Sequence, residues 1–229
     1  MIHPQRQIDP SRAWKEDEAD APHKRSATIL SSTGAAAEAY RSLRANLLYA
    51  FADELVKVIV LTSAGRGEGS STICANLGIA LAQASKNTLI VDCDFRHPAL
   101  HNIFGLRNLR GVTDVLVGKQ SLQEVYQEPV PRLKVVCTGA LLPDMEEVLG
   151  ERRFTEFLDQ ARREFDYVLV DTPPIGEISD SLIFAHHSDG VLLVLDAQKT
   201  GKESIRQSMR RLDAVGAKVL GTVANNAKA

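Results

Sequence analysis

Short apolar runs recur along the chain from residue 58 to near its end. They are almost continuously apolar, a pattern typical of parallel strands that are buried on both faces of a sheet. Strands of this kind are predicted over residues 58–61, 88–96, 133–137, 166–171, 190–196 and 218–224.

Amphipathic stretches lie between these runs and repeat with the period of an α-helix. Helices are predicted over residues 35–52, 71–85, 143–164, 179–186 and 202–215, with short helices starting near residues 113 and 121. Because strands and helices alternate, the chain is predicted to form an α/β fold, with a parallel sheet that is covered by helices on both faces.

The first apolar run ends in a glycine-rich loop, residues 64–69, that opens directly into a helix. Gly65, Gly67 and Gly69 allow positive φ angles and a close approach of the backbone to a ligand. The helix start brings several backbone N–H groups and the positive end of a helix dipole to the same point. The pattern therefore predicts a phosphate-binding loop.

The spacing of this loop matches the pattern G/A-x-x-x-x-G-K-S/T, with Ala64 first and Gly69 sixth, except at the seventh position. Ser70 stands where the pattern has the lysine that reaches the β- and γ-phosphates, whereas Ser71 keeps the hydroxyl that binds Mg²⁺. Arg66 is a candidate to supply a guanidinium instead, from a different backbone position. For the loop alone, a glycine turn that binds nothing remains the alternative.

Carboxylates follow two of the predicted strands, at the sheet edge where open parallel sheets bind ligands. Asp92 and Asp94 stand two residues apart, which suits holding Mg²⁺ and acting as a general base, with helix capping as the alternative. Asp171 ends an almost wholly apolar strand before Thr-Pro-Pro, as expected of the acid that holds Mg²⁺ in P-loop nucleotidases. We therefore expect these three carboxylates to gather beside the glycine loop.

Glu38, Arg41 and Arg44 stand three residues apart on the first predicted helix, so they share one face of it. Two interpretations remain open from this spacing. The charges either form local ion pairs on a solvated stripe, worth tenths of a kcal/mol each, or they pair across a subunit interface.

With 229 residues, of which 44% are hydrophobic and 24% charged, the chain is long enough for one domain with one good core. Residues 1–33 are polar, so this domain is expected at residues 34–229, behind an arm that is mobile or wraps it. A formal net charge of −2 gives no general attraction to nucleic acid or anionic lipid. The absence of a signal peptide pattern or a long apolar run predicts a soluble, cytoplasmic protein. Three scattered cysteines are expected to be buried reduced thiols: Cys74, Cys93 and Cys137.

Five ordered motifs resemble those of the bacterial tyrosine kinases. These are the cytoplasmic autokinases of capsular and exopolysaccharide synthesis, related to the deviant P-loop ATPases of plasmid partition and division-site placement. The motifs are Glu38-x-x-Arg-x-x-Arg44, the glycine loop, and residues 89–96, 168–174 and 220–225. The resemblance implies a P-loop NTPase with a mostly parallel central sheet, which binds ATP or ADP together with Mg²⁺.

The resemblance also implies roles for single residues. The phosphates would be wrapped by Gly65, Arg66, Gly67, Glu68, Gly69, Ser70, Ser71 and Thr72. Within this loop, Ser71 would bind Mg²⁺ and Thr72 would lie near the α-phosphate. Arg96 would sit beside the phosphates or hold the subunit contact, and Asn225 resembles the residue that reads adenine.

The three carboxylates have family counterparts as well. Asp92 looks like the base that takes the proton from a tyrosine hydroxyl, Asp94 like an outer-shell Mg²⁺ ligand, and Asp171 like the second acid of the metal site. Glu38, Arg41 and Arg44 match the oligomerisation helix of the family, which favours the interface interpretation.

Members of this family form rings in which each subunit offers a tyrosine-rich tail to its neighbour. A membrane-embedded partner that sets polysaccharide chain length switches them on. The resemblance therefore implies a homo-oligomer that a partner recruits to the inner membrane. The chain departs from the family at Ser70, and its four tyrosines are not grouped: Tyr40, Tyr49, Tyr126 and Tyr167.

Two functions follow from the resemblance and this departure. One is an ATP-dependent protein tyrosine autokinase that regulates polysaccharide synthesis and export. The other is a catalytically degenerate subunit of the export machinery that binds nucleotide or serves as a scaffold. A positioning switch of the partition type is disfavoured, because Gly65 and Arg66 stand where that type carries its signature lysine.

Overall fold

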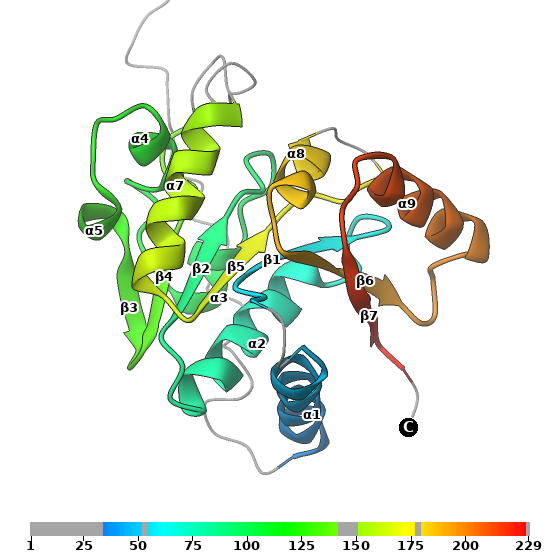
Figure 1. The fold of residues 1–229 in the computed structure, drawn as a ribbon. Coiled ribbons are helices and arrows are strands. Elements are labelled where there is room, and N and C mark those ends of the chain that lie inside the picture. The colour runs from blue at the N-terminus through cyan, green and yellow to red at the C-terminus, as the bar shows by residue number, and fades with distance from the viewer. Residues whose placement is uncertain (1–33, 52–54, 142–150, 177–179, 228–229) are drawn as a thin grey trace, which may run out of the picture.

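The computed structural model describes residues 34–51, 55–141, 151–176 and 180–227, which form one sheet between two layers of helices (Figure 1). The seven strands of this sheet follow the spatial order β3-β4-β2-β5-β1-β6-β7. Their bounds are β1 Val58–Ser63, β2 Thr88–Asp92, β3 Gln127–Val130, β4 Leu133–Val136, β5 Tyr167–Asp171, β6 Gly190–Asp196 and β7 Val219–Asn225. The pairings are parallel, apart from the antiparallel pair of β3 and β4 at one edge.

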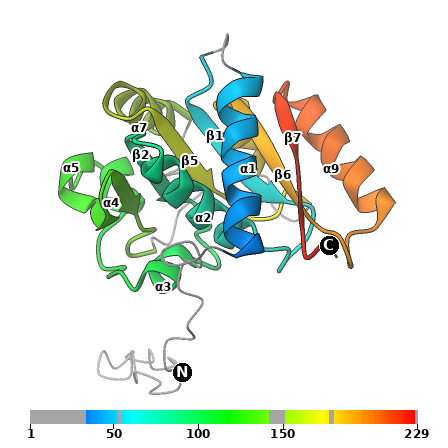
Figure 2. The ribbon, with the colours of Figure 1, turned by 90° about the horizontal axis from the view of Figure 1, so that it is seen from below.

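Helices cover both faces of the sheet (Figures 1 and 2). Their bounds are α1 Ala35–Ala50, α2 Ser70–Gln83, α3 Leu100–Phe104, α4 Val112–Leu116, α5 Leu122–Val125, α7 Glu151–Glu164, α8 Asp180–His186 and α9 Lys202–Ala214. The helices α1, α2 and α3 pack on one face, and α7, α8 and α9 pack on the other. Within the described part of the chain, no helix is both long enough and apolar enough to cross a membrane.

The central strands alternate between the two cores, because successive side chains of a strand point to opposite faces. Val58 and Val60 of β1 belong to the cluster beneath α7 and α8, whereas Ile59 and Leu61 belong to the cluster beneath α1 and α2. The fully buried β1 is therefore apolar at every one of these positions, as its sequence predicts.

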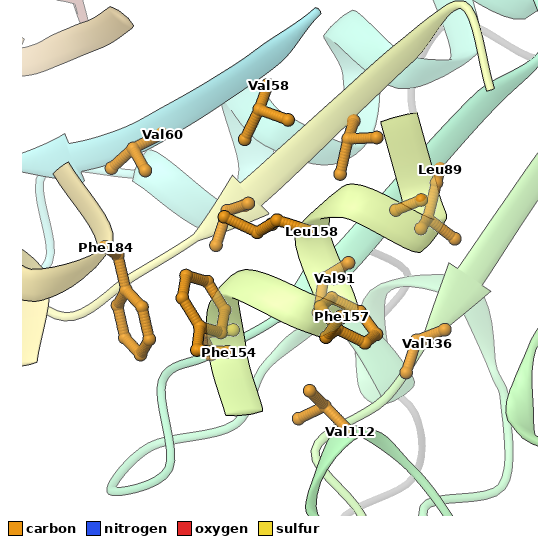
Figure 3. Close-up of a cluster of buried hydrophobic side chains, with 14 of the residues drawn as sticks. Val58, Val60, Leu89, Val91, Val112, Val136, Phe154, Phe157, Leu158 and Phe184 are labelled. Carbon is orange, nitrogen blue, oxygen red and sulfur yellow. The ribbon is translucent and has the colours of Figure 1, made fainter. Parts of the chain in front are cut away.

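Aromatic side chains of α7 and α8 pack in the cluster beneath these two helices, which Figure 3 shows. The rings of Phe154 and Phe184 lie 4.6 Å apart between centroids, and both side chains are fully buried. Burial of a side chain of this size contributes about 1.5–3 kcal/mol. This cluster therefore fixes α7 and α8 against the strands whose carboxyl ends carry the candidate site.

The structure confirms the α/β fold class, the mostly parallel sheet and the helices on both faces. The three cysteines are free and buried, as expected. The N-terminal arm, residues 1–33, lies outside the described residues, as do residues 142–150 at the start of the helix predicted from residue 143.

Two parts of the prediction were wrong. The second strand ends at Asp92 and does not continue to Arg96, because Asp92 and Asp94 accept backbone N–H groups of the next residues and turn the chain away. The short elements β3 and α3 were not predicted. β3 is polar and contains Pro129, which an edge strand tolerates but which does not signal a strand in the sequence.

Candidate functional site

The glycine loop, residues 64–69, joins β1 to α2 at the carboxyl edge of the sheet. Gly67 and Gly69 have φ angles of +73° and +95°, which L-residues with a side chain rarely adopt. Ile73 N–H donates to the Gly69 carbonyl at 2.9 Å, so the helix starts immediately after the loop. The first N–H groups and the positive dipole end of this 14-residue helix therefore face the loop, as an anion site requires.

Two side chains hold this loop in place through hydrogen bonds. Glu68 is 6% exposed, and its carboxylate accepts Ala64 N–H at 2.9 Å and the Thr200 hydroxyl at 2.5 Å. Asn225, at the end of β7, donates its amide to the Glu68 carbonyl at 2.8 Å. The Glu68 side chain is thus turned into the protein, where these hydrogen bonds fix the shape of the loop. The part that Thr200 plays was missed, because 132 residues separate it from Glu68 in the sequence.

Asp171 lies at the end of β5, the strand that is paired with β1 on one side and β2 on the other. It is fully buried, and neither carboxylate oxygen accepts a hydrogen bond. Burial, reinforced by the charge of Asp92, raises the pKa of Asp171 well above its ordinary value. The hydroxyl of Ser71 lies close enough to lower this pKa in part, but it does not complete a hydrogen bond to either oxygen.

A buried carboxyl group without a donor is costly, and native structures rarely keep one without a ligand or function. Ser71, at the start of α2, lies near the Asp171 carboxyl group. The described residues hold no group of three His, Cys, Asp or Glu side chains that would bind a metal alone. Nucleotide-bound Mg²⁺ needs only one or two carboxylates besides phosphate oxygens and water, so Ser71 and Asp171 fit this ion.

Asp92 is the direct neighbour of Asp171 across the β2–β5 ladder. Its Oδ1 accepts Asp94 N–H at 3.2 Å, and its Oδ2 accepts Ala99 and Leu100 N–H at 3.1 Å each. Burial raises the pKa of Asp92 to about 7, although these backbone N–H groups lower it in part. Asp92 therefore caps the start of α3, which is the alternative that its sequence left open. Its role as a base stays a prediction.

The segment after β2 folds back toward the glycine loop. The half-buried Asp94 accepts Arg96 N–H at 3.2 Å and His97 N–H at 2.9 Å through its Oδ1. Arg66 of the glycine loop meets His97 with 2.5 Å between Nη2 and Nε2. The contact with His97 was missed, because the sequence shows no signal that joins these two loops. Arg96 is exposed on the same segment.

The charges of α1 are engaged within this chain. Arg41 pairs with Glu38 at 2.6 Å, and Arg44 donates to the Ala80 carbonyl of α2 at 3.0 Å. Arg44 therefore helps to dock α1 on α2. Whether the three residues also meet a second subunit stays a prediction.

Comparisons with known proteins identify the relatives of this chain. The family described as AAA domain matches residues 56–223. Tyrosine-protein kinase YwqD of Bacillus subtilis is 36% identical over 192 residues, which are 83% of this chain and 81% of the relative. The putative tyrosine-protein kinase CapB of Staphylococcus aureus is 31% identical over 189 residues, 82% of this chain and 83% of the relative. The crystal structure of the chimerical protein CapA2B2 superposes with a TM-score of 0.84 at 31% identity, covering 90% of this chain and 92% of that one.

Proposed function

The chain belongs to the bacterial tyrosine kinases, and from this premise we propose that it is an ATP-dependent tyrosine autokinase-like protein that regulates capsular or exopolysaccharide synthesis and export. The observation that carries this proposal is the buried Asp171 carboxylate, which lacks a donor on both oxygens and lies near Ser71 beside the glycine loop. A bound cation compensates a buried carboxylate that has no hydrogen-bond donor, which explains why a fold keeps such a group.

The backbone of the glycine loop and the first turn of α2 would hold the phosphates of ATP or ADP. Ser71 and Asp171 would bind Mg²⁺ directly, with Asp94 in its outer shell. When bound, this ion neutralises charge on the transferring phosphoryl group. Arg96 would contact the phosphates from the segment after β2, and Asn225 would reach the adenine from the end of β7.

Asp92 would take the proton from an incoming tyrosine hydroxyl. A pKa raised to about 7 by burial supports this role, because a base works best when its pKa lies near the working pH. Its hydrogen bonds to Ala99 and Leu100 would hold the carboxylate in place during the transfer.

Ser70 favours a second candidate, a degenerate subunit that binds nucleotide without efficient transfer. Position 70 is the first residue of α2, where the P-loop lysine normally contacts the β- and γ-phosphates. Charge placed on the transferring group is a major catalytic contribution, and loss of one such contact typically costs about 10²–10³ in rate.

Phosphate transfer from γ-labelled ATP to a tyrosine-containing polymer and to the chain itself tests the proposal. The kinase is supported if the natural protein transfers phosphate slowly and Ser70→Lys raises the transfer rate at least about tenfold. MgATP binding without transfer in either protein supports the degenerate subunit. Absence of nucleotide binding at millimolar concentration in both proteins rejects both candidates.

The remaining parts of the proposal concern assembly. The chain would form a homo-oligomer through Glu38, Arg41 and Arg44. Nucleic acid would not be among its partners. A membrane-embedded polysaccharide co-polymerase would recruit it to the inner membrane. The spacing of the three α1 charges and the family membership support the ring.

A further inference from the structure

We propose that Arg66, positioned by His97, supplies to the nucleotide phosphates the positive charge that Ser70 cannot provide. The inference rests on the proposed nucleotide binding and adds to it the side chain that replaces the lysine. Its ligand is the β- and γ-phosphate groups of a magnesium-bound nucleoside di- or triphosphate.

A cation is needed because the loop otherwise offers a phosphate chain only dipoles. Backbone N–H groups and the end of α2 together carry about half an elementary charge. Ser70, Ser71 and Thr72 add hydroxyl groups, which are neutral. Arg66 is the only lysine or arginine from Ser63 to Thr72, so the one full positive charge of this segment is placed there.

The contact with His97 joins the loop after β1 to the loop after β2 at the carboxyl edge of the sheet. Arg66 follows β1, His97 follows β2, and β5 lies between these two parallel strands. An interaction between the two loops therefore spans the carboxyl end of β5, which is Asp171. This is the side of a phosphate loop on which the metal and the terminal phosphate lie.

His97 is itself held in position. Its backbone N–H donates to Asp94 Oδ1 at 2.9 Å, and Asp94 lies close enough to Asp171 for its charge to raise the pKa of that carboxyl group. The Arg66 contact is therefore anchored to the same segment that carries a proposed metal-site residue. Exposed arginines without such an anchor lose more side-chain entropy on binding a ligand.

The chemistry of the pair defines the role of each partner. A guanidinium has donors and no acceptor, so His97 Nε2 is the acceptor in this contact. A guanidinium carries five N–H donors in a planar fork, so one guanidinium can donate to more than one group, and its geometry suits phosphate oxygens. His97 is thus a positioning residue, and Arg66 is the residue that contacts the ligand.

Calorimetric titration of MgADP into the full chain and its variants tests the inference. Arg66→Ala should weaken binding by about tenfold to a hundredfold, the usual range for loss of a charge-assisted hydrogen bond. Arg66→Lys should keep part of the affinity. Arg163→Ala, which removes the same charge from an exposed site on α7, should leave the affinity unchanged.

A double-mutant cycle separates phosphate contact from loop structure. In a Ser70→Lys background, Arg66→Ala should cost less than threefold, because the introduced lysine supplies the charge. His97→Ala should weaken MgADP binding severalfold, whereas His97→Gln should restore much of it, because the amide oxygen can accept from Arg66.

Three results would overturn the inference while leaving nucleotide binding intact. These are an unchanged affinity in Arg66→Ala, an equal loss in both Ser70 backgrounds, and a loss confined to Arg96→Ala. If the natural chain binds no MgADP at millimolar concentration, the proposed function fails and the inference fails with it.

Discussion

Replacement of Asp171 by asparagine is predicted to stabilise the ligand-free protein while it removes Mg²⁺-dependent nucleotide binding. The substitution keeps the size of the side chain. It removes an ionisable group that the fold buries completely and leaves without a donor on either oxygen. Replacing a residue that serves folding destabilises the protein. Replacing a residue that is retained for its ligand stabilises the protein in the absence of that ligand.

The size of the stabilisation by Asp171→Asn follows from how the stability of the natural protein depends on pH. Because burial raises the pKa of Asp171 well above 3.8, the folded state keeps a proton that the unfolded chain releases above that pH. Stability of the natural protein therefore falls as pH rises, by about 1.4 kcal/mol per pH unit, until the carboxyl group ionises in the folded state. The asparagine variant lacks this loss. Its advantage should be near zero at pH 4 and should grow with pH at this rate until the carboxyl group ionises in the folded state.

Urea denaturation followed by circular dichroism between pH 4 and 7.5, in EDTA, measures this difference. Asp159→Asn on the exposed face of α7 is the matched control and should follow the natural protein. Addition of MgADP at 100 times its dissociation constant should stabilise the natural protein by about 2.7 kcal/mol and the Asp171 variant by none. A variant that is less stable than the natural protein near pH 6, or that still gains stability from MgADP, refutes the reasoning.

Three further predictions concern the capping of α3, the packing around Gly111 and the proposed subunit contact. Asp92→Ala should destabilise the ligand-free protein by about 1–3 kcal/mol in urea denaturation, because it leaves the first N–H groups of α3 without an acceptor; no loss would contradict the capping role. Gly111→Ala should cost about 1–3 kcal/mol, because a Cβ there collides with the backbone of residues 137–139. Gly221→Ala on β7 meets open space and should be within about 0.5 kcal/mol of the natural protein; equal effects of the two substitutions would refute the packing argument. Arg41→Ala should reduce the mass measured by light scattering to that of a monomer, and an unaltered oligomer would refute the proposed ring contact.

The strand, glycine loop and helix that frame the site could be predicted from the sequence because their signals are local. A buried β-strand, glycines at Gly67 and Gly69, and a helix start follow one another within a few residues. The position of Asp171 could be predicted for the same reason, since a continuous apolar run leads to it.

Contacts between distant segments could not be predicted. The sequence does not reveal that β5 lies between β1 and β2, and this arrangement brings Arg66 to His97 across 31 residues. The inward turn of Glu68 depends on Thr200, which lies beyond five further strands of the chain. The capping role of Asp92 was considered from the sequence, but only the hydrogen bonds to α3 distinguish it from a side chain that faces solvent.

The central claim is that the glycine loop and the Asp171 carboxylate together bind a magnesium-bound nucleotide. Isothermal titration of ADP into the natural protein, with Mg²⁺ and then with excess EDTA, tests it most directly. The account predicts saturable binding to one site per chain that EDTA weakens strongly. Absence of binding at millimolar ADP with Mg²⁺, or an affinity that EDTA leaves unchanged, would contradict the account.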